Sequence, residues 1–212
     1  MGRLYQRIAN EGIGIFYDGD VADLITADMK ANGGLLTRDD LADCAPTNLV
    51  PLIGNYRGFE VATNQLPGGG LMILEMLNIL EHFDLAAMGH NSAQYIATVA
   101  EAMKYATIDK DQFMGDPNFI DVPQDLLASK ARAAEIAAKI RAGEKADIVR
   151  LNLGAPESKD TTHLVVADAA GNVVNVTHSL GSSSGVITDG LGFMYNNCMM
   201  VFDPRPGHVG SL

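Results

Sequence analysis

The residues best suited to chemistry are the run Lys159-Asp160-Thr161-Thr162-His163. A threonine hydroxyl that follows a loose linker and opens a strand can attack the carbonyl carbon of the residue before it. Water then cleaves the resulting ester, and Thr161 becomes a new N-terminus after Asp160. A free α-amine titrates at roughly pH 7.7–8.0, so it can act as the general base for its own hydroxyl in acyl transfer. A Thr-Thr pair is also ordinary β-branched strand material, so the surrounding residues must decide.

Other polar residues near this run have alternative roles. His163 is either a general base or a structural residue, and the mechanism that uses the α-amine does not require it. His178 and Ser179 are adjacent, so on a strand their side chains point to opposite faces and do not form a Ser-His pair. The loop Gly181–Gly185 is rich in serine and glycine, and it is either an anion cradle or a plain turn. Its place beside Ser179 favours an active-site loop.

The first part of the chain has the residue spacing of helices. From Asp20 onward, apolar residues recur at helical intervals. The Asn32-Gly33-Gly34 sequence is a strong stop signal, because glycine accepts the left-handed conformation that ends many helices. Thr37 then begins a sequence typical of a capping box, with aspartate in place of the usual glutamate.

Two short strands and three further helices are expected next. Alternation between Val50 and Thr63 predicts the strands. A helix that starts near Leu71 is apolar around so much of its circumference that we expect it to be central. The other two helices are expected over Ser92–Asp111 and Gln124–Arg141.

The pattern changes after the last of these helices. Residues 142–160 carry scattered charges and have no clear period, which is typical of a linker. Strand-like runs follow at Thr161–Val166 and at residues 173–177, and a third extended stretch follows the Gly181–Gly185 loop. We therefore predict an α+β chain, with a mostly helical part over residues 1–160 and a β-rich meander over residues 161–212.

Composition limits the classes of function. The formal net charge of -11 repels phosphate backbones, so we expect no nucleic-acid partner. Cys44 and Cys198 are far apart in the sequence, so we expect two buried thiols, with a disulfide left open. No cluster of His, Cys and carboxylate residues has metal-ligand spacing, so we expect no metal. We also expect no cofactor. No apolar run is long enough to span a bilayer, and we expect no signal peptide in the polar first residues.

Several blocks of the sequence resemble the gamma-glutamyltransferase family. In chain order they are NGGLLTRDDLADC, YRGFEV, LPGGG, LNILEHFDL, AEAMKYATIDKDQFMGDPNF, DTTHLVVADAAGNVVNVTHSLGSSSG and GLGFMYNN. They occur in the family's order between about residue 11 and about residue 207, so the resemblance covers almost the whole chain. Several independent blocks in one order are far more specific than any single motif.

The resemblance implies an αββα N-terminal-nucleophile hydrolase sandwich, incomplete in this chain, whose precursor cuts itself into a large and a small subunit. Thr161 matches the family's nucleophile, and Asp160 would end the large subunit. Ser179 matches a threonine that supports the nucleophile, which a serine hydroxyl can also do. The implied activity is hydrolysis or transfer of the γ-glutamyl group of glutathione or a related amide through an acyl-enzyme. The implied partners are that substrate and the two subunits, and many bacterial relatives are periplasmic or secreted.

Two departures from the family's pattern concern substrate recognition. Gly181 stands where the family has an asparagine, and we assign Gly181 and Ser182 to a substrate-binding loop. The stretch around Val201 lacks the family's acidic residue, which grips the α-amino group of the substrate, and Asp203 could replace it only by a shift of register. Charge-assisted contacts are the strong ones, so loss of this carboxylate and of the asparagine amide should weaken recognition of a γ-glutamyl group. An acylase for another amide is therefore an open alternative.

The resemblance also implies that this chain is a piece of a longer gene product. The family's oxyanion-hole glycines lie beyond its last residue, and an arginine that binds the substrate carboxylate lies before its first. Loss of an oxyanion hole costs roughly two to three orders of magnitude in rate. A second alternative is therefore an inactive, unprocessed scaffold fragment.

Overall fold

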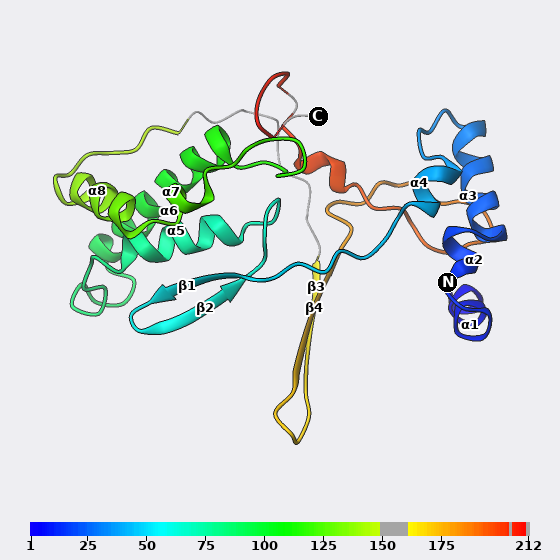
Figure 1. The fold of residues 1–212 in the computed structure, drawn as a ribbon, viewed down its shortest axis with the longest axis horizontal. Helices are drawn as coiled ribbons and strands as arrows, with labels where there is room; N and C mark the ends of the chain where they lie inside the picture. The colour runs from blue at the N-terminus through cyan, green and yellow to red at the C-terminus, as the bar shows by residue number, and fades with distance from the viewer. Residues whose placement is uncertain (149–160, 204, 211–212) are drawn as a thin grey trace. The chain divides into compact units, whose positions relative to one another are not determined.

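The computed structural model describes residues 1–148, 161–203 and 205–210, and Figure 1 traces their elements. The chain divides into two compact units. Unit 1 comprises Met1–Thr47 and Gly154–Val201, and unit 2 comprises Asn48–Leu153 and Phe202–Leu212. Each unit therefore contains residues from both sides of position 160. The described residues confirm an α+β chain, whereas the predicted division at residue 160 concerns cleavage and stays a prediction.

Unit 1 begins with four helices: α1 (Gly2–Glu11), α2 (Gly14–Tyr17), α3 (Asp20–Ala31) and α4 (Arg38–Ala42). The helix predicted from Asp20 is α3, and it ends just before the expected Asn32-Gly33-Gly34 signal, where Gly33 has a φ of 73°. The predicted capping box is confirmed at the start of α4. The Thr37 amide donates to Asp40 Oδ2 at 2.8 Å, and the Asp40 amide donates to Thr37 Oγ1 at 3.3 Å.

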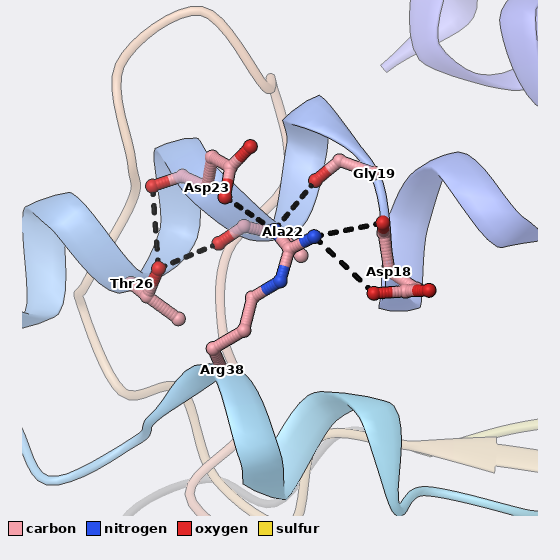
Figure 2. Close-up of polar contacts among 6 residues, drawn as sticks. All are labelled: Asp18, Gly19, Ala22, Asp23, Thr26 and Arg38. Carbon is pink, nitrogen blue, oxygen red and sulfur yellow. Dashed lines mark hydrogen bonds and ion pairs between the residues drawn. The ribbon is translucent and has the colours of Figure 1, made fainter.

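Arg38 ties the start of α4 to the start of α3, as Figure 2 shows. Its guanidinium donates to the carbonyl oxygens of Gly19 at 2.9 Å and Asp18 at 2.7 Å, and it pairs with the carboxylates of Asp18 and Asp23. Thr26, further along α3, donates back to a carbonyl of its own helix at 2.9 Å. A planar guanidinium has enough donors in fixed directions for such a bridge, which a lysine lacks.

The core of unit 1 joins these helices to residues that follow position 160. Its buried members are Leu4, Val21, Ala22, Ile25, Leu41 and Leu191. Thr188, only 4% exposed, donates to Asp28 Oδ2 of α3 at 2.6 Å, and its hydroxyl also lies 2.6 Å from the Tyr195 hydroxyl. An apolar core and a partly buried polar cluster therefore both connect the helical part of unit 1 to the part that follows the predicted cleavage position.

Two strands of unit 1, β3 (Thr161–Ala167) and β4 (Val173–Ser179), form an antiparallel hairpin, which confirms both strands predicted here. The turn between them is organised by Asp168. Its Oδ1 accepts hydrogen bonds from the backbone amides of Ala170 and Asn172, each at 2.9 Å. Hydrogen bonds from Asn172 hold the pKa of Asp168 below its usual value, and the bond from the Asn172 side chain has the largest effect. Asp and Asn side chains that bind nearby backbone groups in this way stabilise turns.

The third extended stretch of the predicted meander does not form a strand in the described residues. Within the described residues that follow the hairpin, the structure has only an isolated bridge between Ser183 and Asn196 and a 3₁₀ helix, η1 (Cys198–Val201). The backbone groups of this stretch bind one another instead. The Tyr195 amide donates to the Val186 carbonyl at 3.0 Å, and the Ser184 hydroxyl donates to the Tyr195 carbonyl at 2.6 Å. The described β structure of unit 1 is therefore a two-stranded hairpin.

Unit 2 contains a second hairpin, β1 (Leu52–Tyr56) and β2 (Phe59–Thr63), and the helices α5 (Gly70–Leu80), α6 (Ala93–Phe113), α7 (Gln124–Leu127) and α8 (Lys130–Arg141). The single helix predicted from Gln124 to Arg141 is wrong, because the structure divides it into α7 and α8. Ser129 begins the second part by accepting a hydrogen bond from the Arg132 amide at 3.2 Å. Asn78 of α5 donates to the Ala128 carbonyl at 2.8 Å, and so binds a backbone group at the break.

The prediction that the apolar helix near Leu71 is central is confirmed. Helix α5 buries Leu71, Leu74 and Ile79, and it packs against both α6 and α8. It also buries Glu75, which is 1% exposed and whose carboxyl oxygens have no hydrogen-bond partner within 3.5 Å among the described residues. Helix α5 is therefore the centre of unit 2 and carries an acidic side chain into its interior.

The expectation of two buried thiols is wrong. Cys44, which follows α4, and Cys198, the first residue of η1, are both free and exposed. Across the described residues, no helix has the length and apolar character needed to cross a bilayer.

Candidate active site

The first rung of the β3–β4 hairpin brings together the two hydroxyls that the sequence selects. Thr161 pairs with Ser179 in the strand register, and Thr161 Oγ1 lies 3.0 Å from Ser179 Oγ. Either oxygen can be the donor in this hydrogen bond. Both residues are exposed, so the pair is accessible in the described part of the chain.

The strand register sorts the other polar residues onto two faces. Thr161, His163, Thr177 and Ser179 share one face, because residues two apart on a strand point the same way and paired residues point together. Thr162 pairs with His178, so both lie on the opposite face. The exclusion of a Ser-His pair between adjacent residues therefore agrees with the register.

His163 forms a second cross-strand pair beside the first. Its Nδ1 atom lies 2.9 Å from Thr177 Oγ1. The two rungs place an imidazole and three hydroxyls in succession on one exposed face. This arrangement can hold the imidazole ring in one orientation beside the proposed nucleophile.

Gly181 supports the Ser179 hydroxyl through its backbone. The Gly181 amide donates to Ser179 Oγ at 3.1 Å. Its φ is 71°, and a Cβ atom at this position would lie 3.2 Å from the Cα of Cys198. Glycine is therefore the residue that suits this backbone conformation and this close approach. The position that departs from the family's pattern contributes a backbone donor to the site.

The Ser182 side chain points into the protein rather than toward solvent. Ser182 is 5% exposed, and its hydroxyl accepts a hydrogen bond from Asn197 Nδ2 at 3.1 Å. The Asn197 amide also donates to the Leu180 carbonyl at 2.8 Å. Asn197 thus holds the loop after Ser179 from both its backbone and its side chain. Asn197 ends the sequence block GLGFMYNN, but the sequence did not predict this role.

Asp160 and Asp203, which were also considered from the sequence, do not belong to the site described above. Asp160 lies outside the described residues, as does most of the predicted linker. Asp203 belongs to unit 2, and its carboxylate is paired with Arg205, which donates to Oδ1 through Nε at 2.9 Å. This pairing holds the pKa of Asp203 far below its usual range. A carboxylate already neutralised in this way is a poor substitute for the missing acidic anchor of a substrate ammonium group.

The described part of the chain also has surface hollows whose linings include no residue of the hairpin. A shallow surface hollow of about 490 Å³ lies along α3 and α4 and is lined by Asp23, Lys30, Leu35 and Arg38 among others. Its lining does not include Thr161 or Ser179. In the described part of the chain, no group of three or more His, Cys, Asp or Glu side chains has an arrangement suited to a metal ion.

Comparison with known proteins places the chain in a family. Residues 1–210 match the family model described as gamma-glutamyltranspeptidase. The chain belongs to the gamma-glutamyltranspeptidase family. It is 38% identical over 213 residues to the glutathione hydrolase proenzyme of Escherichia coli K12, a match that covers 98% of this chain. It is 41% identical over 208 residues to the acylase ACY 1 proenzyme of Pseudomonas sp. strain V22, a match that covers 97% of this chain.

Solved structures of an acylase and of a gamma-glutamyltranspeptidase share its fold. A cephalosporin acylase from Bacillus halodurans matches with a TM-score of 0.80 at 30% identity, over 98% of this chain and 37% of that chain. The gamma-glutamyltranspeptidase of Helicobacter pylori matches with a TM-score of 0.63 at 37% identity, over 70% of this chain and 42% of that chain. The shared fold therefore does not distinguish a transpeptidase from an acylase, and the side chains of the site must do so.

The chain spans 37% of the length of each of the two curated relatives described above. The resemblance read from the sequence blocks is confirmed at the level of the family. The assignments of individual residues remain predictions.

Proposed function

We propose that the protein is an autoprocessing amide hydrolase or transferase, in which cleavage after Asp160 frees Thr161 to act as the nucleophile. The observation that carries this proposal is the 3.0 Å contact between Thr161 Oγ1 and Ser179 Oγ. A nucleophilic hydroxyl needs neighbours that orient and activate it. Ser179 is such a neighbour, and it is itself held by the Gly181 amide.

In the mature protein, the α-amine of Thr161 accepts the proton of Oγ1 while that oxygen attacks the carbonyl carbon of an amide. The departing amine takes this proton as the C–N bond breaks, which leaves an acyl-enzyme on Thr161. Water resolves the ester in hydrolysis, and an acceptor amine resolves it in transfer. Donors for the developing oxyanion belong to the family's pattern beyond this chain, so the proposal concerns the longer protein.

The proposal extends to the architecture of that protein. Residues 1–160 end a large subunit and residues 161–212 begin a small subunit, within an αββα N-terminal-nucleophile hydrolase sandwich. Contacts within unit 1 support association of the two pieces after cleavage. Leu191 packs in one core with Ile25, and Thr188 binds Asp28. Hydrolysis of one peptide bond leaves these contacts in place.

Glutathione or another γ-glutamyl amide is the first candidate substrate, because the Escherichia coli relative is named a glutathione hydrolase proenzyme. An acylase activity toward a different amide is the second candidate. It is favoured by Gly181 in place of an amide side chain and by the pairing of Asp203 with Arg205. The 41% identity to an acylase proenzyme points the same way.

The test is cleavage and activity of the full-length protein that carries this chain. Denaturing electrophoresis and intact mass should show two pieces that meet between Asp160 and Thr161. Thr161→Ala should stop the cut and lower amide turnover by at least roughly 10³-fold. Assays with a γ-glutamyl anilide and with a non-glutamyl amide then separate the two candidate substrates.

Thr162→Ala is the matched control, because Thr162 is adjacent but lies on the opposite face of the hairpin. This variant should be cut and should retain turnover. If Thr161→Ala matured normally, the nucleophile would be misassigned. An uncut wild-type chain without amide turnover would favour the scaffold alternative.

A further inference from the structure

Self-cleavage lacks the base that the mature enzyme would use. Before the bond between Asp160 and Thr161 is cut, the Thr161 nitrogen belongs to a peptide group, whose lone pair is delocalised into the carbonyl. It cannot accept the proton of Oγ1. Ser179 Oγ, which lies 3.0 Å from Thr161 Oγ1, belongs to a hydroxyl and is a weak base. Another group must receive this proton while the chain is still intact.

His163 lies where such a group is needed. It shares a face of β3 with Thr161, two residues along the strand, which corresponds to about 6.6 Å of strand rise. An imidazole side chain and one bridging water can span this separation. Nδ1 lies 2.9 Å from Thr177 Oγ1. When Nδ1 donates its proton to that oxygen, Nε2 presents a lone pair and can accept one.

The other titratable groups of the hairpin lie elsewhere. His178 pairs with Thr162 on the opposite face. Asp168 lies in the turn at the far end of the strands, where its carboxylate binds Asn172. Among the described residues of β3 and β4, His163 is therefore the titratable side chain on the same face as Thr161.

We infer that His163 accepts the Thr161 hydroxyl proton, through one water molecule, during self-cleavage but not during turnover. This inference rests on the proposed function. As Oγ1 bonds to the carbonyl carbon of Asp160, the water takes the Oγ1 proton and passes one of its own to His163 Nε2. The imidazolium returns a proton to the Thr161 nitrogen as the C–N bond breaks. A second water hydrolyses the resulting ester to the Asp160 carboxyl group and the Thr161 hydroxyl.

The test follows the rate at which full-length precursor, refolded from denaturant, separates into two pieces. His163→Asn keeps a donor near the position of Nδ1 but removes Nε2, and it should slow the cut by roughly 10²-fold. Free imidazole should restore part of the rate to His163→Ala and none to Thr161→Ala. Turnover, normalised to the amount of cut protein, should fall much less than the cleavage rate.

His178→Asn is the matched control, because it makes the same substitution on the opposite face. It should be cut at the wild-type rate. A wild-type rate in His163→Asn, equal slowing in His178→Asn, or no rescue of His163→Ala by imidazole would each overturn the inference. If Thr161→Ala is still cut at the same bond, the proposed function itself fails. If Thr161→Ala stays intact while His163→Asn is cut normally, only the role of His163 fails.

Discussion

Burial distinguishes the α5–α6–α8 packing of unit 2 from the β3–β4 hairpin of unit 1. In unit 2, Ile79, Ala102 and Ala137 are completely buried where these helices meet. In the hairpin, every residue of both strands is exposed. Val174 and Leu164, which share one face, are 60% and 56% exposed.

The buried helices of unit 2 stabilise the fold, whereas the exposed hairpin of unit 1 carries the proposed nucleophile. Helices that bury one another gain free energy from the removal of apolar surface from water. A two-stranded hairpin on its own is at best marginally stable, and an apolar sheet face normally packs against another layer. The proposed nucleophile therefore lies on a hairpin whose strand residues are all exposed rather than packed in a core.

The largest expected effect tests this contrast directly. Ile79→Ala should lower the free energy of unfolding by about 3–4 kcal/mol, because it leaves a cavity in a closed core. Val174→Ala, a substitution in the hairpin, should change it by less than about 0.5 kcal/mol in this 212-residue chain. Urea unfolding measures both values. Similar losses in the two variants would mean that the hairpin face is covered in solution.

The next effect concerns the buried acid of unit 2. Burial raises the pKa of Glu75 to about 9 from an ordinary value of 4.5, with the neighbouring Asp109 adding to the shift and Arg132 opposing it. Asp109 is 3% exposed and is bound by the Arg132 side chain, whose Nε donates to it at 2.8 Å. Glu75 should therefore be protonated in the folded protein at neutral pH.

The sign of the pH dependence follows from this shift. The folded state resists ionisation of Glu75, so its full stability is present below the unfolded pKa of 4.5 and is lost as pH rises toward about 9. Glu75→Gln should remove this loss and stabilise unit 2 at pH 7 by on the order of 2–3 kcal/mol. Urea unfolding of both proteins across this pH range measures the difference. A difference that does not change with pH would contradict a protonated Glu75.

A smaller effect on stability is expected at Gly181, whose amide binds the Ser179 hydroxyl. Gly181→Ala should lower the stability of the hairpin end by about 1–2 kcal/mol, because it combines a positive φ with a Cβ contact of 3.2 Å. Gly185→Ala is a close control, with a φ of 73° and nothing within 4 Å of the added Cβ. Amide hydrogen exchange of β4 measures both. Equal effects would show that conformation alone, and not the contact, requires glycine at 181.

The smallest effect is expected at the turn. Asp168→Ala removes the acceptor that binds the Ala170 and Asn172 amides, so exchange of hairpin amides should become faster while α5 is unaffected. The pKa of Asp168 is lowered in the folded protein. Its contribution is therefore present above the unfolded pKa and is lost as pH falls through the folded pKa. Lower protection of the wild-type hairpin amides in acid, relative to intrinsic exchange at the same pH, with no such loss in the variant, would confirm the sign.

Local sequence patterns predicted much of this structure. A few neighbouring residues were enough to predict the capping box at Thr37 and the two strands around Asp168. Caps and turns depend on groups that are close together in the chain. The break between α7 and α8 was missed. Ser129 caps the second helix there, while Asn78, which is distant in sequence, binds the carbonyl of Ala128.

By itself, the sequence determined which residue types can do chemistry and, through alternation and a turn, that a strand at Thr161–Val166 is followed by another at residues 173–177. The tertiary structure decided how these residues are supported. It placed Asn197 against the Ser182 hydroxyl, gave Gly181 its role as a donor and buried Glu75 beside Asp109. Hydrogen bonds and burial of this kind depend on which distant segments meet, and spacing along one segment does not specify that.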